Sequence, residues 1–252
     1  MAQSNNVTSL FKHLEAGSGD ADQRVACTDC SLYRLCLPLG LKNNDLVRLD
    51  QIISRSQGYN RGASLFVMDA PFNSLFVVRS GSFKSFIPAS NGREQVTGFY
   101  FPGEFIGMDA IHGKSYRSTA KALESSSVCE LPFEGMQELS MEVPQLQVQL
   151  LTRLSKELCN DKSLMMLLGK KNADEKMATF LLSLSTRFHE RGFSATEFSL
   201  SMSRGDIANH LGLAVETVSR LLTRFHEDGL ILVNGKQIIL QNMEKLKSLC
   251  DA

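Results

Sequence analysis

Apolar residues recur at steps of three and four along the last third of the chain, and this pattern predicts two consecutive helices. The first begins after Ser203, an N-cap residue with Asp206 three positions on, and ends before Gly212, where the chain can reverse. The second helix carries apolar residues at Val215, Val218, Leu221, Leu222 and Phe225. Two short helices joined by so tight a turn predict a helix-turn-helix.

The segment after the second helix has the pattern of a β-hairpin. Gly229 ends the helix, and two apolar runs, 230–233 and 236–240, flank a two-residue turn at Asn234-Gly235. Asn-Gly between such runs is the strongest short hairpin signal. A hairpin directly after a helix-turn-helix predicts a winged helix; the alternative is an αα-hairpin that only packs against the rest of the protein.

The polar face of the second helix carries Glu216, Ser219 and Arg220 near its N-terminal end, which is the end that enters a major groove. Arginine bonds guanine twice, glutamate accepts a hydrogen bond from cytosine, and serine contacts either base type or a thymine methyl group. We therefore expect double-stranded DNA as a partner, with a G·C pair beside A·T pairs in the site. The formal net charge of zero does not itself indicate nucleic acid.

The middle of the chain shows a shorter period. Between Gly62 and Leu131, glycine, proline and asparagine separate short segments with the pattern of strands, at 64–67, 75–79, 82–87, 95–100 and 126–131. Short, regularly spaced strands of this kind predict a small β-barrel, which either holds a ligand or only forms a packed core.

A long helix is predicted from Pro144 onward, with one stripe of residues at steps of three and four. The stripe comprises Leu146, Leu150, Leu154, Leu158, Asp161, Met165 and Leu168. Such a seam favours pairing with a second copy of the helix in a homodimer. Asp161 interrupts it: either two Asp161 carboxylates face each other and oppose association, or Asp161 is solvated at the edge of the stripe.

Length and composition fit an α+β protein of two compact domains. We expect a flexible polar arm over 1–24, a sensor domain with the barrel over 25–143, a dimerisation helix over 144–171 and a winged helix-turn-helix domain over 172–252. The first residues lack the pattern of a secretory signal, and no run approaches eighteen apolar residues. These features predict a soluble cytoplasmic protein without a membrane partner.

Three of the six cysteines, Cys27, Cys30 and Cys36, lie within ten residues, so one loop can bring them to a single centre. Zinc sites also use a two-residue spacing, but they usually have a second such pair, which is absent here. Three neighbouring cysteines with a distant fourth favour an iron–sulfur cluster. Spacing alone does not make Cys129 the fourth ligand. No nucleotide loop or nucleophile elbow accompanies the thiols, so an enzyme is not expected.

These features together resemble the FNR (or ANR) oxygen-sensing regulators of the CRP/FNR superfamily over nearly the whole chain. The resemblance rests on the segments 95–99, 130–134 and 215–220 and on four of the cysteines, Cys27, Cys30, Cys36 and Cys129. The resemblance implies a barrel of the cyclic-nucleotide-binding or cupin type and an oxygen-labile [4Fe-4S] cluster on Cys27, Cys30, Cys36 and Cys129. It also implies a homodimer that reads TTGAT-type inverted repeats through Glu216, Ser219 and Arg220, and that activates or represses genes of anaerobic metabolism.

The resemblance further implies contacts of surface loops with RNA polymerase, including Asn91-Gly92. We expect a bound cluster to favour the dimer by offsetting the Asp161 repulsion. Two alternatives stay open. A related CRP-type sensor of a cyclic nucleotide would use the pair Arg117-Ser118 for the phosphate, but Met108 stands where a ribose-binding glutamate is expected. The cysteines would otherwise hold a structural zinc.

Overall fold

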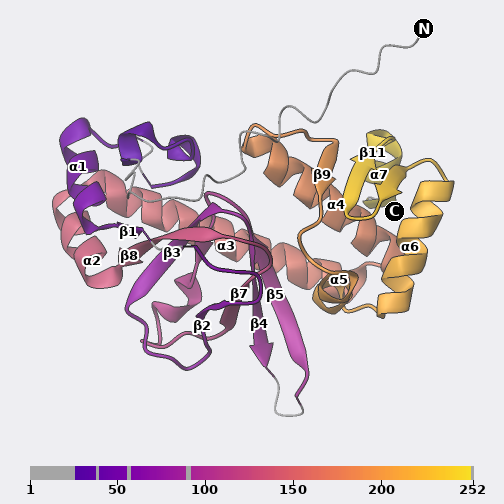
Figure 1. Cartoon of the computed structure of the whole chain (residues 1–252), viewed down its shortest axis with the longest axis horizontal. Coiled ribbons are helices and arrows are strands. Elements are labelled where there is room, and N and C mark those ends of the chain that lie inside the picture. Colours follow the sequence, from indigo (N-terminus) through magenta and orange to yellow (C-terminus); the bar gives the residue numbers. More distant parts are fainter. Residues whose placement is uncertain (1–25, 38–39, 56–57, 89–91, 251–252) are drawn as a thin grey trace, which may run out of the picture.

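The computed structural model describes residues 26–37, 40–55, 58–88 and 92–250 (Figure 1). The expected arm over 1–24 therefore lies outside the described residues. The first described elements are two single-turn 3-10 helices, η3 (Cys27–Asp29) and η4 (Tyr33–Leu35), followed by helix α1 (Asn43–Ile52). The backbone N–H of Cys27 donates to Asp50 Oδ1 at 2.9 Å, which fixes η3 against α1.

The described strands of the sensor domain form two four-stranded sheets, in the orders β1-β8-β3-β6 and β2-β7-β4-β5. Their bounds are Ser54–Arg55 (β1), Ser64–Phe66 (β2), Ser74–Ser80 (β3), Phe83–Pro88 (β4), Glu94–Tyr100 (β5), Phe105–Ile106 (β6), Thr119–Ala122 (β7) and Ser127–Pro132 (β8). The expected small barrel takes the form of a jelly-roll-like pair of sheets that does not close into a cylinder. The reason is that strand pairing stays within each sheet and does not continue around a closed cylinder.

Strand β3 explains how the two sheets share the core. Phe76 and Val78 pack with Phe83 of β4 and Ile106 between the sheets. Their neighbours Leu75 and Val77 belong to a second apolar cluster, beneath the helices on the outer face. Both faces of β3 are therefore covered, which is why its sequence is continuously apolar rather than alternating.

Helices cover the outer face of the first sheet. Helix α2 (Phe133–Glu142) follows β8, and the long helix α3 (Pro144–Lys170) begins one residue later, with Pro144 in its first turn. Proline suits that position because the first helical N–H groups need no partner within the helix. Figure 1 shows α3 running behind the sheets to the winged-helix domain.

The winged-helix domain has the predicted order of elements and one additional strand. Its bounds are Ala173–Glu190 (α4), Glu197–Ser199 (β9), Arg204–Leu211 (α5), Val215–Glu227 (α6), Ile231–Asn234 (β10), Gln237–Leu240 (β11) and Met243–Cys250 (α7). Strand β9 was not predicted; it pairs with β11 to complete a three-stranded sheet. The predicted turn is wrong by one residue. Because Asn234 pairs with Gln237, the turn consists of Gly235 and Lys236, with Gly235 at φ 60°.

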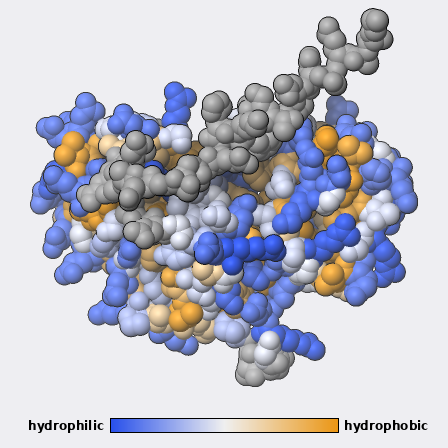
Figure 2. Space-filling model, in the orientation of Figure 1, coloured by the Kyte–Doolittle hydropathy of each residue, from blue (hydrophilic) through white to orange (hydrophobic). Residues whose placement is uncertain are grey.

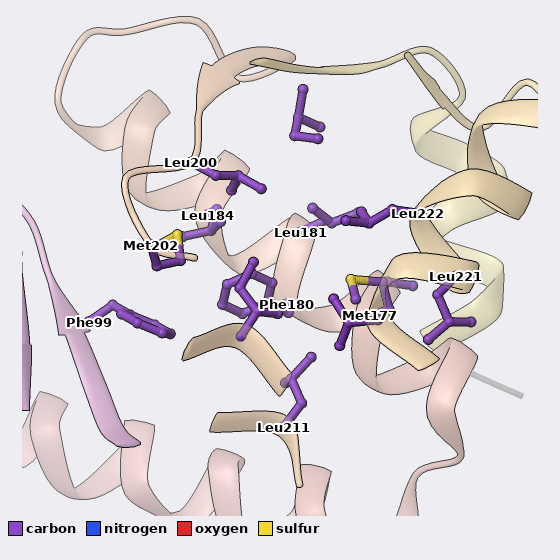
Figure 3. Packing of buried hydrophobic residues seen from close by; sticks show 14 of the residues in the cluster. Phe99, Met177, Phe180, Leu181, Leu184, Leu200, Met202, Leu211, Leu221 and Leu222 are labelled. Atoms are coloured by element: carbon purple, nitrogen blue, oxygen red, sulfur yellow. The ribbon is translucent and has the colours of Figure 1, made fainter. Parts of the chain in front are cut away.

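One apolar cluster joins the two domains. Phe99 of β5 packs edge-on against Phe180 of α4, with ring centroids 6.0 Å apart, and Leu211 of α5 belongs to the same cluster. Figure 3 shows the Phe99 ring extending from its strand toward these helices. The surface in Figure 2 is mostly hydrophilic, with separate apolar patches.

Candidate nucleic-acid interface and cysteine centre

The helix-turn-helix forms where its capping residues predict it. Ser203 and Asp206 make a reciprocal capping box at the start of α5, and Gly212 ends that helix at φ 62°. The apolar face of α6 is buried at Val218 and Leu222, whereas Val215 is 45% exposed. Burial of this face presents the opposite side of α6 to solvent.

That solvent-facing side carries the predicted base readers. Glu216 and Arg220 are exposed and Ser219 is half-buried, all in the first two turns of α6. Arg220 Nε donates to the Glu216 carbonyl oxygen at 3.4 Å, one turn back along the helix. Ala214 offers no side-chain cap, so the first N–H groups of α6 remain available to a phosphate group.

The sensor domain holds the first helix of the motif through polar contacts. Lys84 Nζ lies 2.6 Å from Asp206 Oδ1, and Asn209 Oδ1 accepts a hydrogen bond from the backbone N–H of Val96 at 2.5 Å. Burial lowers the pKa of His210 to about 4, and its ring packs edge-on against Phe99. His210 is therefore a neutral packing residue at ordinary pH.

The cysteine loop and the distant Cys129 share one apolar cluster against the first sheet. Cys27 is buried in an apolar cluster against which Cys36 and Cys129 pack. Cys129 lies on β8, opposite Val77 of β3. Cys30 and Cys129 both act electrostatically on Cys36, so all four thiols belong to one neighbourhood. Cys159 is exposed on α3, and Cys250 lies at the end of α7, outside this group.

The electrostatics of this centre disfavour a free Cys36 thiolate. Burial raises the pKa of the Cys36 thiol to about 12, and the charges of Cys129 and Cys30 raise it further. A metal ligand must be a thiolate, so Cys36 would take that form only with a positively charged metal centre bound to it. Sulfur ligands of this softness suit iron–sulfur clusters and zinc alike.

The four thiols are not arranged around a single metal ion. Within the described residues, no three His, Cys, Asp or Glu side chains are placed to hold one ion. Four thiolates around one zinc lie about 3.8 Å apart, a separation that follows from a Zn–S bond of about 2.3 Å. A four-iron core is wider and accepts ligands that stand farther apart.

The predicted apolar stripe on α3 has a buried first half and an exposed second half. Leu146 is fully buried, and Leu150 and Leu154 pack against the core of the sensor domain, so these three face their own chain. The second half of the stripe is solvent-facing, with Leu158 60% and Met165 70% exposed. The exposed apolar line continues toward the N-terminal half through different residues, Val148 and Leu151.

Asp161 is exposed in the second half of this helix and belongs to an acidic group. Burial raises the pKa of Glu157 to about 7, and the charge of Asp161 raises it further. The pKa of Asp109 is raised for the same two reasons, although backbone hydrogen bonds oppose the rise. This part of α3 therefore already contains repelling carboxylates within one chain.

A cavity of about 470 Å³ lies between β5, α3 and α4, and its lining includes Met108, Glu157 and His210. Arg117 and Ser118, the expected phosphate-binding pair, do not line it. Arg117 is exposed, Ser118 is buried, and Met108 packs in the same apolar cluster as Cys27. These positions give no support to a cyclic-nucleotide site in the cavity.

Two features of the site were not predicted. Arg153 of α3 lies beside Cys36, and Glu104 joins Arg187 of α4 and Arg191, the residue after α4, in a partly buried ion-pair network. Single charged residues carry no spacing signal, so the sequence alone could not identify them. Among the described helices, none combines the length and apolar character needed to cross a membrane.

Comparison with known proteins agrees with this architecture. Residues 56–142 match the cyclic nucleotide-binding domain, and residues 175–249 match the Crp-like helix-turn-helix domain. The transcriptional activator protein anr of Pseudomonas aeruginosa is 50% identical over 219 residues, covering 86% of this chain and 90% of that protein. The fumarate and nitrate reduction regulatory protein of Escherichia coli is 45% identical over 225 residues, covering 89% and 90%.

The structure of FixK2 from Bradyrhizobium japonicum superposes with a TM-score of 0.74 at 32% identity, covering 80% of this chain and 98% of that one. These relatives are regulators and not enzymes, as expected from the sequence. The chain therefore belongs to the CRP/FNR family of transcription regulators and is of the FNR/ANR type.

Proposed function

We propose that this protein is an oxygen-responsive transcription regulator that holds a [4Fe-4S] cluster on Cys27, Cys30, Cys36 and Cys129. The observation that carries the proposal is the meeting of Cys129 on β8 with the Cys27–Cys36 loop in one half-buried neighbourhood. When bound, the cluster would supply an oxygen-labile link between that loop and the sheet. The names of the relatives, which include regulators of fumarate and nitrate reduction, agree with control of anaerobic metabolism.

The chain's own residues transmit the state of that link to α3. Cys27 is fixed to α1 through Asp50, and Leu150 and Leu154 of α3 pack against the same apolar cluster as the cysteines. Ordering of the loop would therefore restrict the motion of α3, whose surface exposes Leu158 and Met165. We propose that this surface pairs with a second copy, that the dimer binds TTGAT-type inverted repeats, and that surface loops contact RNA polymerase. Of the Asn91-Gly92 pair expected there, Asn91 lies outside the described residues.

The cluster is tested by purifying the protein without air and recording its absorption spectrum before and after exposure to air. We expect a broad iron–sulfur band with matching iron and sulfide contents, and loss of the band in air. One zinc per chain without sulfide would instead establish a structural zinc site. A protein with neither metal, whose DNA binding requires a small ligand, would favour a CRP-type sensor.

Arg220→Ala is expected to weaken binding to a TTGAT-type site at fixed salt concentration. Loss of a bidentate contact to guanine costs about 1–3 kcal/mol, which is roughly 5- to 150-fold in affinity. Arg224→Ala is a matched control, since Arg224 lies near the other end of α6 and pairs with Asp174. Equal losses for the two variants in a fluorescence-anisotropy titration would contradict the assignment of Arg220.

Asp161→Ala is expected to favour the dimer of the cluster-free protein. Removal of facing carboxylates in a twofold pair would raise the association constant by about tenfold, equivalent to about 1.4 kcal/mol. Sedimentation velocity over a range of concentrations measures this constant, with Glu138→Ala, an exposed carboxylate of α2, as the control. An unchanged constant for Asp161→Ala would favour the alternative in which Asp161 is only solvated.

A further inference from the structure

A positive charge without an anionic partner lies beside the cysteine centre. Arg153 of α3 is half-buried, and its Nη2 donates to the carbonyl oxygen of Cys36 at 3.4 Å. Its Nε is buried and has no hydrogen-bond partner, which is true of no other buried side-chain nitrogen or oxygen in the described parts of the chain. None of the ion pairs between described residues includes Arg153.

This arrangement is unfavourable for the protein by itself. A buried donor without an acceptor costs about 1–3 kcal/mol, and a half-buried charge without a counter-charge adds to that cost. A side chain held in such a position indicates that an acceptor and a negative charge arrive from outside the polypeptide. The nearest place for them is the cysteine centre, because Arg153 acts electrostatically on Cys36.

An iron–sulfur cluster brings both missing partners. Four thiolates carry more negative charge than the metal–sulfide core carries positive charge, so the complete centre is an anion. Its sulfur atoms accept hydrogen bonds, and such bonds together with the net charge around a cluster set its properties. A neutral apolar ligand in the same place would supply neither the hydrogen-bond acceptor nor the negative charge that Arg153 lacks.

We propose that Arg153 is a positioning residue for the cluster, compensating its negative charge and donating the unpartnered Nε–H to it. The inference rests on the proposed function and extends it, because Arg153 belongs to α3. It would give the dimerisation helix a direct electrostatic contact with the loaded centre, in addition to the packing of Leu150 and Leu154.

The test compares Arg153→Met, which keeps an unbranched stem without charge, with Arg153→Lys, which keeps the charge. In cluster-loaded protein without air, we expect iron to pass to a ferrous chelator about tenfold faster from Arg153→Met than from the parent. This is the order of effect for loss of one charge-assisted hydrogen bond. Arg153→Lys should restore much of the difference, and Lys170→Met, which removes an exposed charge from the end of α3, should match the parent.

A second measurement separates this role from ordinary packing. In cluster-free protein, the melting temperature of Arg153→Met should be no lower than that of the parent. The substitution removes a charge that has no ion-pair partner, so no ion pair is lost. Lower melting of the cluster-free variant, with no rescue by Arg153→Lys, would show that Arg153 only packs and would overturn the inference.

The remaining outcomes distinguish the two proposals. Equal release rates for the parent and Arg153→Met would overturn the role of Arg153 and leave the cluster in place. A parent protein that takes up no iron and sulfide on anaerobic reconstitution would overturn the proposed function, and the inference with it.

Discussion

Cys129→Ser is expected to leave the protein without a stable cluster, even when it is prepared without air. A serine hydroxyl is a harder ligand and a much weaker acid than a thiol, so one of the four bonds to the core is lost. Because Cys129 is the proposed ligand that belongs to the sheet, its loss would also detach the loop from β8. Iron and sulfide should fall to a small fraction of the parent's content. Affinity for an inverted-repeat site should fall by about 100-fold or more, as expected when two half-sites are no longer bound together.

The matched control is Cys159→Ser. Cys159 is an exposed thiol on α3, outside the group formed by Cys27, Cys36 and Cys129. This variant should keep the parent's iron, sulfide and DNA affinity. A Cys129→Ser protein that retains a full cluster would show that a different fourth ligand completes the centre.

The local features of this fold were readable from the sequence, whereas the pairings between distant strands were not. The helix-turn-helix follows from Ser203, Asp206 and Gly212, residues whose caps act within a few positions of themselves. A closed barrel and two packed sheets place short strands in the chain in the same way. They differ in which strands become neighbours, such as β1 beside β8, so the sequence predicted a small barrel but not the division of its strands between two sheets.

Helix α3 shows the same limit at the scale of single side chains. A period of three to four residues identifies an apolar stripe, but it does not show whether the stripe packs on the chain's own core or on another molecule. Leu146 and Leu158 belong to the same predicted stripe, yet one is fully buried in its own chain and the other is 60% exposed. Where the helix leaves the sensor domain, the partner of the stripe changes from the chain's own core to solvent or a second copy.

The cysteine centre combines both kinds of information. Three of its thiols are close in sequence, so their meeting was predictable. The placement of Cys129 depends on the register of β8 against β3 and was indicated only by the family resemblance. Arg153 required the structure itself, because its significance lies in the partner that it lacks.

One carboxylate contributes two ion pairs to the contact between the two domains. Glu104 pairs with Arg187 of α4 and with Arg191, the residue after α4, and Arg191 also donates to the Pro102 carbonyl oxygen at 2.7 Å. The Arg191 side chain is only 4% exposed. Arg187 lies over the ring of Phe101, 4.5 Å from its centroid, which adds a cation–π contact. Glu104 thus neutralises two guanidinium groups that sit where the sensor domain meets α4.

Glu104→Gln is therefore expected to destabilise the protein by about 3 kcal/mol at neutral pH, because removal of one partner leaves the other charges buried and uncompensated. Glu190→Gln is the control. Glu190 pairs with Lys156 at 3.3 Å in solvent, and exposed pairs of this kind contribute about 0–1 kcal/mol. Chemical denaturation of both variants beside the parent measures the difference. Since the lost pairs join two domains, the Glu104→Gln transition should also broaden or split.

The same network predicts how this difference depends on pH. Burial raises the pKa of Glu104, but the charges and hydrogen bonds of Arg187 and Arg191 outweigh it and hold the pKa below its usual value of 4.5. A carboxyl group with a lowered pKa stabilises the fold above its unfolded pKa, and this contribution disappears as the pH falls through the folded value. The gap between the parent and Glu104→Gln should be constant above about pH 5 and should close below about pH 4.5. A gap that persists unchanged into strong acid would mean that Glu104 acts through packing rather than through its charge.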